Sequence, residues 1–273
     1  MKTAAVLFSG GADCTLAAAQ AAQRGDFDEV VLLTYLVPVS CMDDNSRRNV
    51  PHLERAFPQV SFHQEMLPVG PLLEKVISKH RWRFVAKHGL IEASLCLHCR
   101  LAMHVRTIMY CLDAGIRDVF DGSNITMALW VDQTRRGIQM VDELYAAFGI
   151  TIQHPVFYDA GDDLFDLVKY LSDEDRRKLV PRSTSRQLHE LGILADPGQK
   201  SDFAASYRAQ PVCLGVVMSL MHSIGTVLPF RSYDSYNRDA LRWYESKTTL
   251  FRTLLVDYRA RRADSELGRA CCG

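Results

Sequence analysis

The first 24 residues contain the pattern that most constrains the fold of this chain. Residues 4–8 are a short apolar run, Gly10 and Gly11 follow, and residues 14–24 are rich in alanine. A short apolar run bounded by glycine is typical of a buried strand, and alanine is the best helix former. A strand that turns directly into a helix is the repeating unit of α/β folds.

Strand-like and helix-like segments alternate through the first 160 residues. The sequence predicts strands at residues 4–8, 29–34, 61–65 and 118–120. It predicts helices at residues 14–24, 47–57, 72–79 and 96–114. His154 and Pro155 are interpreted as leading into a further strand at residues 156–158. Because strands separated by helices pair in parallel, we expect an α/β fold with a doubly wound parallel sheet.

The second half of the chain is predicted to be mainly helical. Ser172, which three acidic residues follow, has the character of a helix start, and residues 213–224 and 238–261 are predicted as further helices. The expected organisation is an α/β domain over residues 1–160, a helical extension over residues 161–264 and a flexible tail over residues 265–273.

The composition argues against a membrane or secretory protein. Apolar residues make up 48% of the chain, but no run approaches the roughly 20 residues that a membrane span requires. The N-terminal apolar run is shorter than the roughly 7–15 residues of a secretory signal. The 32 basic and 32 acidic residues cancel, so no overall charge attracts nucleic acid. We expect a cytoplasmic protein with no membrane partner.

The glycine turn after the first strand has the chemistry of a phosphate site. The N–H groups of Gly10 and Gly11 can approach phosphate oxygens closely, and a helix N-terminus favours an anion. Ser9 can donate a hydrogen bond, and Asp13 can hold Mg²⁺ on the phosphates. The Walker A triad and the GxGxxG spacing are both absent. The alternative interpretation is an ordinary glycine turn between a strand and a helix.

Residues 9–14, SGGADC, resemble the SGGxDS signature of the PP-loop ATP pyrophosphatases, also called the adenine nucleotide alpha hydrolase-like family. In that family the loop binds the pyrophosphate portion of ATP while a substrate oxygen attacks the α-phosphate, which gives an adenylate and pyrophosphate. The resemblance implies a sheet of the HUP type and ATP and Mg²⁺ as cofactors. It assigns ligand roles to Ser9, Gly10, Gly11 and Asp13. Cys14 stands where the family usually has serine, so a weaker S–H donor replaces a hydroxyl.

A second turn, which contains Asp121, Gly122 and Ser123, follows the strand predicted at residues 118–120. Since the carboxyl ends of parallel strands lie at one edge of the sheet, Gly122 and Ser123 should face the phosphate loop across a cleft and help to bind the nucleotide. Many thiolation enzymes of the PP-loop family have GHxxDD in this turn. Its absence here favours an acceptor other than tRNA.

Cys96 and Cys99 form a CxxC pair at the start of the helix predicted over residues 96–114. Both sulfurs can point at one centre, and the helix N-terminus can stabilise a thiolate. The pair fits iron–sulfur ligands, half of a zinc site, a redox or persulfide pair without metal, and two core cysteines.

The position of this pair, on a helix that leads to the second turn, resembles tRNA 2-thiocytidine synthase and related PP-loop thiolation enzymes. In those enzymes the pair and a distant third cysteine hold a [4Fe–4S] cluster with one open iron. The best third candidate here is Cys213, which is predicted to open a helix. Zn²⁺ is the alternative metal, held by Cys96, Cys99, His98 and Cys213. The four closely spaced zinc cysteines of the more distantly similar 7-cyano-7-deazaguanine synthase are absent.

The remaining cysteines are weaker candidates. Cys41 follows the second strand near the expected nucleotide edge and is a candidate persulfide carrier. Cys111 lies about 18 Å along the helix from Cys99, at a rise of about 1.5 Å per residue, and is predicted to pack in the core. Cys271 and Cys272 are interpreted as bystanders in the tail.

The sequence therefore predicts an ATP-dependent sulfurtransferase. It would adenylate a carbonyl oxygen of a nucleobase, another small acceptor or a tRNA base and replace it with sulfur, releasing AMP and pyrophosphate. Its expected catalytic residues are Asp13, Cys96 and Cys99. Sulfide or a cysteine desulfurase would supply the sulfur, and a homodimer is the candidate assembly. The rival functions are a PP-loop ligase that transfers nitrogen and a noncatalytic adenine-nucleotide or metal-binding regulator.

Overall fold

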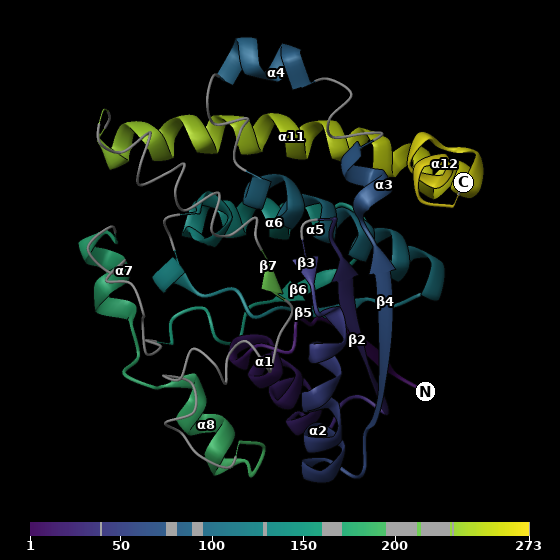
Figure 1. The fold of residues 1–273 in the computed structure, drawn as a ribbon, viewed down its shortest axis with the longest axis vertical. Helices are drawn as coiled ribbons and strands as arrows, with labels where there is room; N and C mark the ends of the chain where they lie inside the picture. Colours follow the sequence, from purple (N-terminus) through teal and green to yellow (C-terminus); the bar gives the residue numbers. More distant parts are fainter. Residues whose placement is uncertain are drawn as a thin grey trace.

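The structure of the chain is a computed structural model. It describes residues 1–38, 40–74, 81–88, 95–127, 130–159, 171–194, 212–213, 230 and 232–272. Figure 1 shows a central sheet with helices on both of its faces. A long helix near the C-terminus lies across the helical layer on one of these faces (Figure 1).

The central sheet has five strands that all run in parallel. They are β1 (Thr3–Leu7), β2 (Glu29–Leu36), β4 (Ser61–Pro68), β5 (Asp118–Phe120) and β6 (Thr151–Gln153). Their order in the sheet is β4-β2-β1-β5-β6. The chain adds β2 and β4 on one side of β1 and then β5 and β6 on the other. The predicted doubly wound sheet is confirmed, and its topological switch point lies between the carboxyl ends of β1 and β5.

Within the described residues, four helices lie against the sheet, namely α1 (Ala12–Gln23), α2 (Val50–Ala56), α5 (Leu95–Ala114) and α6 (Arg135–Ala146). A fifth, α11 (Tyr233–Arg261), lies across α5 and α6. Ala5 and Leu7 of β1 pack in the hydrophobic core that includes α5, α6 and α11. Ala4 and Val6 pack in the core that includes α1 and α2. All four side chains are buried, so β1 has a hydrophobic core on each face.

Shorter elements surround this body. The helices among them are α3 (Gly70–Leu72), α4 (Arg81–His88), α7 (Asp173–Lys178), α8 (Thr184–Glu190) and α12 (Glu266–Cys272). The 3₁₀ helices are η1 (Asp43–Asn49), η5 (Ile125–Met127), η6 (Val131–Gln133) and η10 (Arg262–Asp264). β3 (Ser40–Cys41) and β7 (Val212–Cys213) form a separate antiparallel ribbon. None of the helices in the described ranges is long and apolar enough to cross a membrane.

The helical character of the second half follows from local signals. Ser172 Oγ accepts a hydrogen bond from Asp175 N at 3.1 Å and caps α7, which confirms the predicted helix start. Ser232 caps α11 in the same way, so this helix begins five residues before the predicted range of 238–261. The helix predicted over residues 72–79 can be followed only to residue 74, because the remainder lies outside the described residues.

The end of the chain is not the flexible tail that the sequence suggested. Residues 266–272 form α12, in which Leu267 is fully buried and Ala270 is almost fully buried. Both residues belong to the core that α5, α6 and α11 share. The apolar side of this short helix orders the segment, because its burial offsets the entropy lost on folding.

Two further predictions were wrong in their local structure. His154 and Pro155 follow β6 and do not lead into a strand, because the pairing with β5 ends at Gln153. Cys213 lies in β7, opposite Ser40 of β3, and does not open a helix at that residue. Residues 214–224, which were predicted to continue that helix, lie outside the described residues.

Candidate functional site

The phosphate loop, residues 9–14, lies at the carboxyl end of β1 beside the switch point. Gly10 has a φ of 79°, in the left-handed region that glycine adopts without strain. Gly11 is the N-cap of α1, and its carbonyl oxygen accepts a hydrogen bond from Thr15 N at 3.0 Å. The two glycines therefore turn a buried strand directly into a helix whose N-terminus lies at the carboxyl edge of the sheet.

Cys14 is the centre of the hydrogen bonds within this loop. Its sulfur accepts from Ser9 N at 3.3 Å, lies 3.4 Å from Ser9 Oγ and donates to Gly11 O at 3.2 Å. Burial raises the pKa of the Cys14 thiol. The hydrogen bonds from Ser9 and Gly10 favour the thiolate, but their effect is smaller than that of burial. Cys14 therefore remains a thiol that shapes the loop, and it is poorly suited to act as the sulfur nucleophile.

Asn49 supports the loop from η1, a role that no sequence motif indicates. Its Nδ2 donates to Gly10 O at 2.6 Å and lies 3.4 Å from Thr15 Oγ1. The one signal in the sequence is its position between the second strand and the following helix, where side chains reach the carboxyl edge of the sheet.

Asp13 is held by a residue from the C-terminal half of the chain. Thr184 Oγ1 donates a hydrogen bond to Asp13 Oδ1 at 2.8 Å, and Thr184 is fully buried at the start of α8. The contact orients the carboxylate that the sequence assigns to Mg²⁺. A carboxylate is the hard oxygen ligand that Mg²⁺ prefers, so the residue type fits the metal.

Gly122 brings the second turn into direct contact with the phosphate loop. A Cβ on Gly122 would lie 2.5 Å from Cys14 N and 2.8 Å from the carbonyl carbon of Asp13. The two turns face each other as predicted, but at this point backbone touches backbone and no cleft separates them. Only glycine fits at position 122 without a shift of the start of α1.

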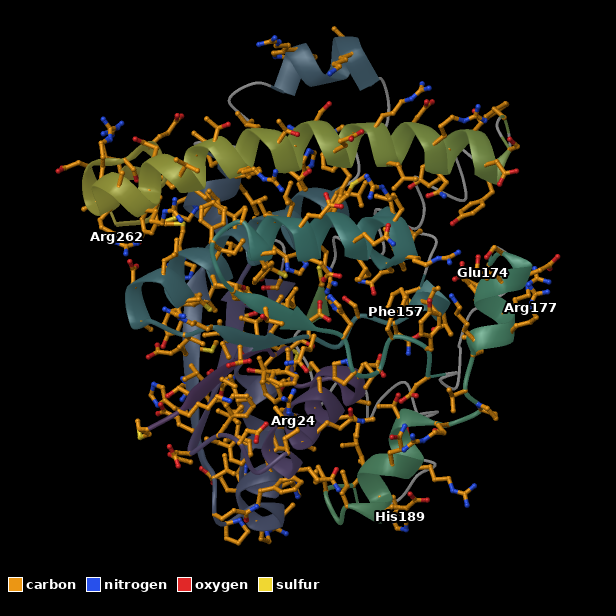
Figure 2. The ribbon with its side chains drawn as sticks, turned by 180° about the vertical axis from the view of Figure 1, so that it is seen from behind. Arg24, Phe157, Glu174, Arg177, His189 and Arg262 are labelled. Atoms are coloured by element: carbon orange, nitrogen blue, oxygen red, sulfur yellow. The ribbon has the colours of Figure 1, made fainter. Side chains whose placement is uncertain are left out.

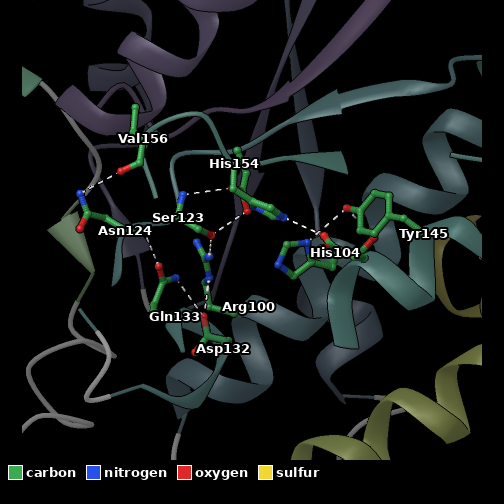
Figure 3. A network of polar contacts seen from close by, with 11 residues as sticks. Arg100, His104, Ser123, Asn124, Asp132, Gln133, Tyr145, His154 and Val156 are labelled. Carbon is green, nitrogen blue, oxygen red and sulfur yellow. Dashed lines mark hydrogen bonds and ion pairs between the residues drawn. The ribbon is translucent and has the colours of Figure 1, made fainter. Parts of the chain in front are cut away.

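Asp121 and Arg100 hold the second turn in place through Ser123, and Figure 3 shows Arg100 beside Ser123. Asp121 accepts hydrogen bonds from Ser123 N at 3.0 Å and from Ser123 Oγ at 2.7 Å. Arg100 Nη2 donates to the same hydroxyl at 2.9 Å. The Ser123 hydroxyl, which the sequence assigned to the nucleotide, is therefore engaged within the turn in this structure.

His154 joins Asp121 to α6. Its Nδ1 lies 2.6 Å from Asp121 Oδ1 and its Nε2 lies 2.9 Å from Asp142 Oδ1 (Figure 3 shows His154 beside Ser123). Burial opposes the imidazolium, but the charges and hydrogen bonds of Asp121 and Asp142 outweigh it and raise the pKa of His154 to about 10. Burial likewise opposes the Asp121 carboxylate, but His154 and Arg100 hold its pKa well below the usual range.

The guanidinium of Arg100 also binds η6. Its Nε donates to Asp132 Oδ2 at 2.9 Å, and Gln133 Nε2 donates to the same oxygen at 3.1 Å. Gln133 Oε1 accepts a hydrogen bond from Asn124 N at 2.9 Å, so η6 is also bound to the residue that follows Ser123 of the second turn. Asp132 is only 2% exposed, so this is an ion pair with a buried carboxylate, and removing Arg100 would leave that charge uncompensated.

Cys96 lies in the first turn of α5 and Cys99 at the start of the second, and Cys99 is buried. Burial raises the pKa of Cys99 to about 12, and the charges of Cys96 and Cys213 contribute to the increase. No group of three or more His, Cys, Asp or Glu residues converges as a metal site within the described part of the chain, so the structure does not assemble the three predicted thiols as a ligand set.

The other candidates have simpler environments. Cys111 is buried in the core, as predicted, and Cys41 is exposed on β3. Arg135 at the start of α6 forms ion pairs with Glu174 and Asp175. Figure 2 shows Glu174 on α7 at the outer side of the molecule.

A cavity of about 560 Å³ lies between α1 and α8, beside the ends of β5 and β6. Its polar lining includes Gln20, Arg24, Gln153, Arg182 and Gln187. Arg24 is already engaged, because its Nη1 donates to Gln153 Oε1 at 2.6 Å. This cavity lies along α1 and not over the phosphate loop, so we assign it no part in the nucleotide site.

Together, the fold and the loop define a doubly wound α/β protein with a glycine-rich anion loop at its switch point. No family model matches the sequence, and no curated protein matches it. Several solved structures are similar to the chain.

The predicted subunit of a tRNA methyltransferase from Methanocaldococcus jannaschii is 15% identical, with a TM-score of 0.34 over 79% of this chain and 97% of that chain. A 4-thiouridine synthetase, solved with RNA and ATP, is 15% identical, with a TM-score of 0.39 over 88% of this chain and 53% of that chain. The U34-tRNA thiolase NcsA from Methanococcus maripaludis, solved with its [4Fe–4S] cluster, is 9% identical, with a TM-score of 0.38 over 91% of this chain and 73% of that chain. At these values the similarities assign no function to this chain.

Proposed function

We propose that this chain is an ATP-dependent sulfurtransferase. The observation that carries the proposal is the junction of two features at one edge of the sheet. The phosphate loop at the end of β1 touches the second turn through Gly122, and Arg100, which directly follows Cys99, is hydrogen-bonded to that turn through Ser123. An anion loop that contacts this turn, and a thiol pair whose neighbour Arg100 is hydrogen-bonded to the same turn, suit a reaction in which ATP activates an acceptor and sulfur replaces its oxygen.

In the first step the phosphate loop would bind the phosphates of ATP. Gly10 and Gly11 keep the backbone close to the N-terminus of α1, and Asp13 presents a carboxylate that Thr184 orients. Mg²⁺, when bound with ATP, neutralises phosphate charge and favours loss of pyrophosphate. The carbonyl oxygen of the acceptor attacks the α-phosphorus, the bond to the bridging oxygen breaks, and pyrophosphate leaves.

In the second step a sulfur nucleophile displaces AMP from the activated carbon. Sulfide does so without a redox step. A persulfide on Cys96 would instead form a mixed disulfide with the acceptor. External thiols would cleave this disulfide, release the thiolated acceptor and return Cys96 to the thiol, and would leave as their own disulfide. The acceptor class is a nucleobase, a related small molecule or a tRNA base, and the sulfur donor is sulfide or a cysteine desulfurase.

Cys96, Cys99 and Cys213 are the residues that would hold a [4Fe–4S] cluster, with Zn²⁺ as the alternative. Three thiolates are soft ligands that suit both metals and leave one position open. The three thiols do not converge on one point in this structure, so the proposed donor set rests on the residue types alone.

Two measurements test this function. Pyrophosphate release from ATP is followed with nucleobases, nucleotides and tRNA as acceptors, and the product is examined for sulfur. Iron, zinc and labile sulfide are determined on protein purified without oxygen. About four irons and four sulfides per chain, lost in Cys96→Ser, Cys99→Ser and Cys213→Ser variants, would establish a cluster.

The rival functions make different predictions for the same experiments. Full activity with ammonia in the Cys96→Ser and Cys99→Ser variants would support nitrogen transfer. Tight ATP binding without pyrophosphate release for any acceptor would support a regulator. Absence of both iron and zinc, with activity retained, would support a persulfide.

A further inference from the structure

Arg100 lies between the two parts of the proposed site. It follows Cys99 directly on α5, and its guanidinium reaches two different segments. Nη2 donates to Ser123 Oγ at 2.9 Å and Nε donates to Asp132 Oδ2 at 2.9 Å. Both partners are buried, at 1% and 2% exposure, and Figure 3 shows the guanidinium between them. One side chain thus ties the start of α5 to the second turn and to η6, which requires the fork of donors that only arginine has.

The second turn, which Arg100 binds, packs directly against the phosphate loop. Gly122 precedes Ser123 and lies so close to the start of α1 that a Cβ would come within 2.5 Å of Cys14 N. Backbone that packs against backbone has no side chain to absorb a small movement, and close-packed interiors transmit strain. A shift of Ser123 therefore moves Gly122 against the start of α1.

The far side of the turn is held rigidly. Asp121 accepts two hydrogen bonds from Ser123, His154 binds Asp121, and Asp142 binds His154 from α6. These are hydrogen bonds to charged groups, which are stronger than neutral ones. Because Asp121 is fixed to α6, a movement of the turn displaces Ser123 and therefore Arg100 at the start of α5.

We infer that Arg100 is a positioning residue that couples occupation of the phosphate loop to the reactivity of the cysteine pair. It contacts neither the phosphates nor the reacting sulfur, and acts through Ser123 on one side and Cys99 on the other. This inference rests on the proposed function, because it requires ATP to bind at residues 9–14. Its effect in the reaction would be to bring the sulfur site into its working geometry only when ATP is in place.

The test measures the alkylation rate of Cys96 by peptide mass spectrometry, with and without ATP and Mg²⁺, on the protein as purified. We expect ATP to change this rate at least fivefold in the wild type, within the roughly 5–150-fold range of allosteric coupling. Arg100→Lys keeps the charge but cannot bridge Ser123 and Asp132. Ser123→Ala removes one partner and leaves Arg100 intact. In both variants the effect of ATP should fall below twofold when the rate is measured at an ATP concentration that saturates that variant, as established by an ATP titration.

Two controls accompany the measurement. Cys271 on α12 serves as an internal thiol whose rate ATP should not change. Arg136→Lys alters an exposed arginine on α6 that is paired with Glu143, and it should behave like the wild type.

The outcomes separate the inference from the proposed function. If ATP binds but leaves the Cys96 rate of the wild type unchanged, or changes the rate as much in Arg100→Lys and Ser123→Ala as in the wild type, the coupling is refuted and the sulfurtransferase proposal stands. If ATP does not bind to the wild type, both are refuted. If Arg100→Lys does not fold, Ser123→Ala alone decides between these results.

Discussion

Thr184 Oγ1 donates a hydrogen bond to Asp13 Oδ1 at 2.8 Å, across 171 residues of sequence. The phosphate loop is therefore completed by α8, which belongs to the half of the chain predicted as a helical extension. Thr184 is fully buried and Asp13 is half-buried, so the bond to the carboxylate is partly shielded from competing water.

Replacing Asp13 by Asn should abolish pyrophosphate release and leave the fold intact. The amide keeps the shape of the side chain and can still accept from Thr184, but it has lost the charge that holds Mg²⁺. Circular dichroism and a pyrophosphate assay on the same preparation check this prediction. Turnover by the Asn variant would show that Asp13 is not the metal ligand.

Replacing Thr184 by Val should raise the Mg²⁺ concentration needed for half-maximal pyrophosphate release. The variant keeps the shape of the side chain but loses a hydrogen bond to a charged group. Such a bond is worth about 1.5–3 kcal/mol, which corresponds to about tenfold or more in affinity. Thr184→Ser restores the hydroxyl and serves as the matched control. An Mg²⁺ titration that is identical for the Val and Ser variants would contradict a role for the hydroxyl.

Replacing Gly122 by Ala should destabilise the protein by about 1–3 kcal/mol and weaken ATP binding. The new methyl group would overlap the backbone of Cys14 and Asp13, and overpacking has costs of this size. Gly149→Ala is the control, because its Cβ meets open space and only its φ of 71° is unfavourable. Urea denaturation and ATP titration of both variants test the prediction, which requires that only Gly122→Ala lose affinity.

The stability contributed by His154 should decline from about pH 6.5 to about pH 10. The folded-state pKa of His154 is raised to about 10 from 6.5, so its contribution is complete below pH 6.5 and is lost as the pH rises through the folded pKa. A difference of one between the folded and unfolded pKa corresponds to about 1.4 kcal/mol of stability. In His154→Asn the free energy of unfolding should fall less steeply over this range.

Urea denaturation at pH 6, 8 and 9.5 measures this difference. His63→Asn, at an exposed position on β4, is the matched control and should keep the slope of the wild type. Equal slopes for the wild type and His154→Asn would show that the imidazolium does not stabilise the fold.

The elements around the phosphate loop were predictable because their signals are local. The strand predicted at residues 118–120, in which Val119 and Phe120 are strong strand formers, has the bounds of β5. The helix predicted from residue 96 begins one residue earlier, at Leu95. Such patterns depend only on neighbouring residues in the sequence, so the helices and strands can be predicted without knowledge of the tertiary structure.

The contacts that build the site were not predictable, because they join distant segments. No periodicity indicates that Thr184 meets Asp13 or that Arg100 meets Ser123. His154 was misplaced because Val156 and the residues after it are more apolar than the short strand Thr151–Gln153. That strand is defined by its hydrogen bonds to β5, which outweigh its weak intrinsic preference.

The central position of β1 has a consequence for how the protein would lose activity on heating. β1 has a neighbouring strand on each side and a hydrophobic core on each face, so no partial opening can release it alone. Its amide hydrogens should exchange with solvent only when the whole molecule unfolds. Since the phosphate loop continues directly from this strand, nucleotide binding and the folded state should disappear in a single thermal transition.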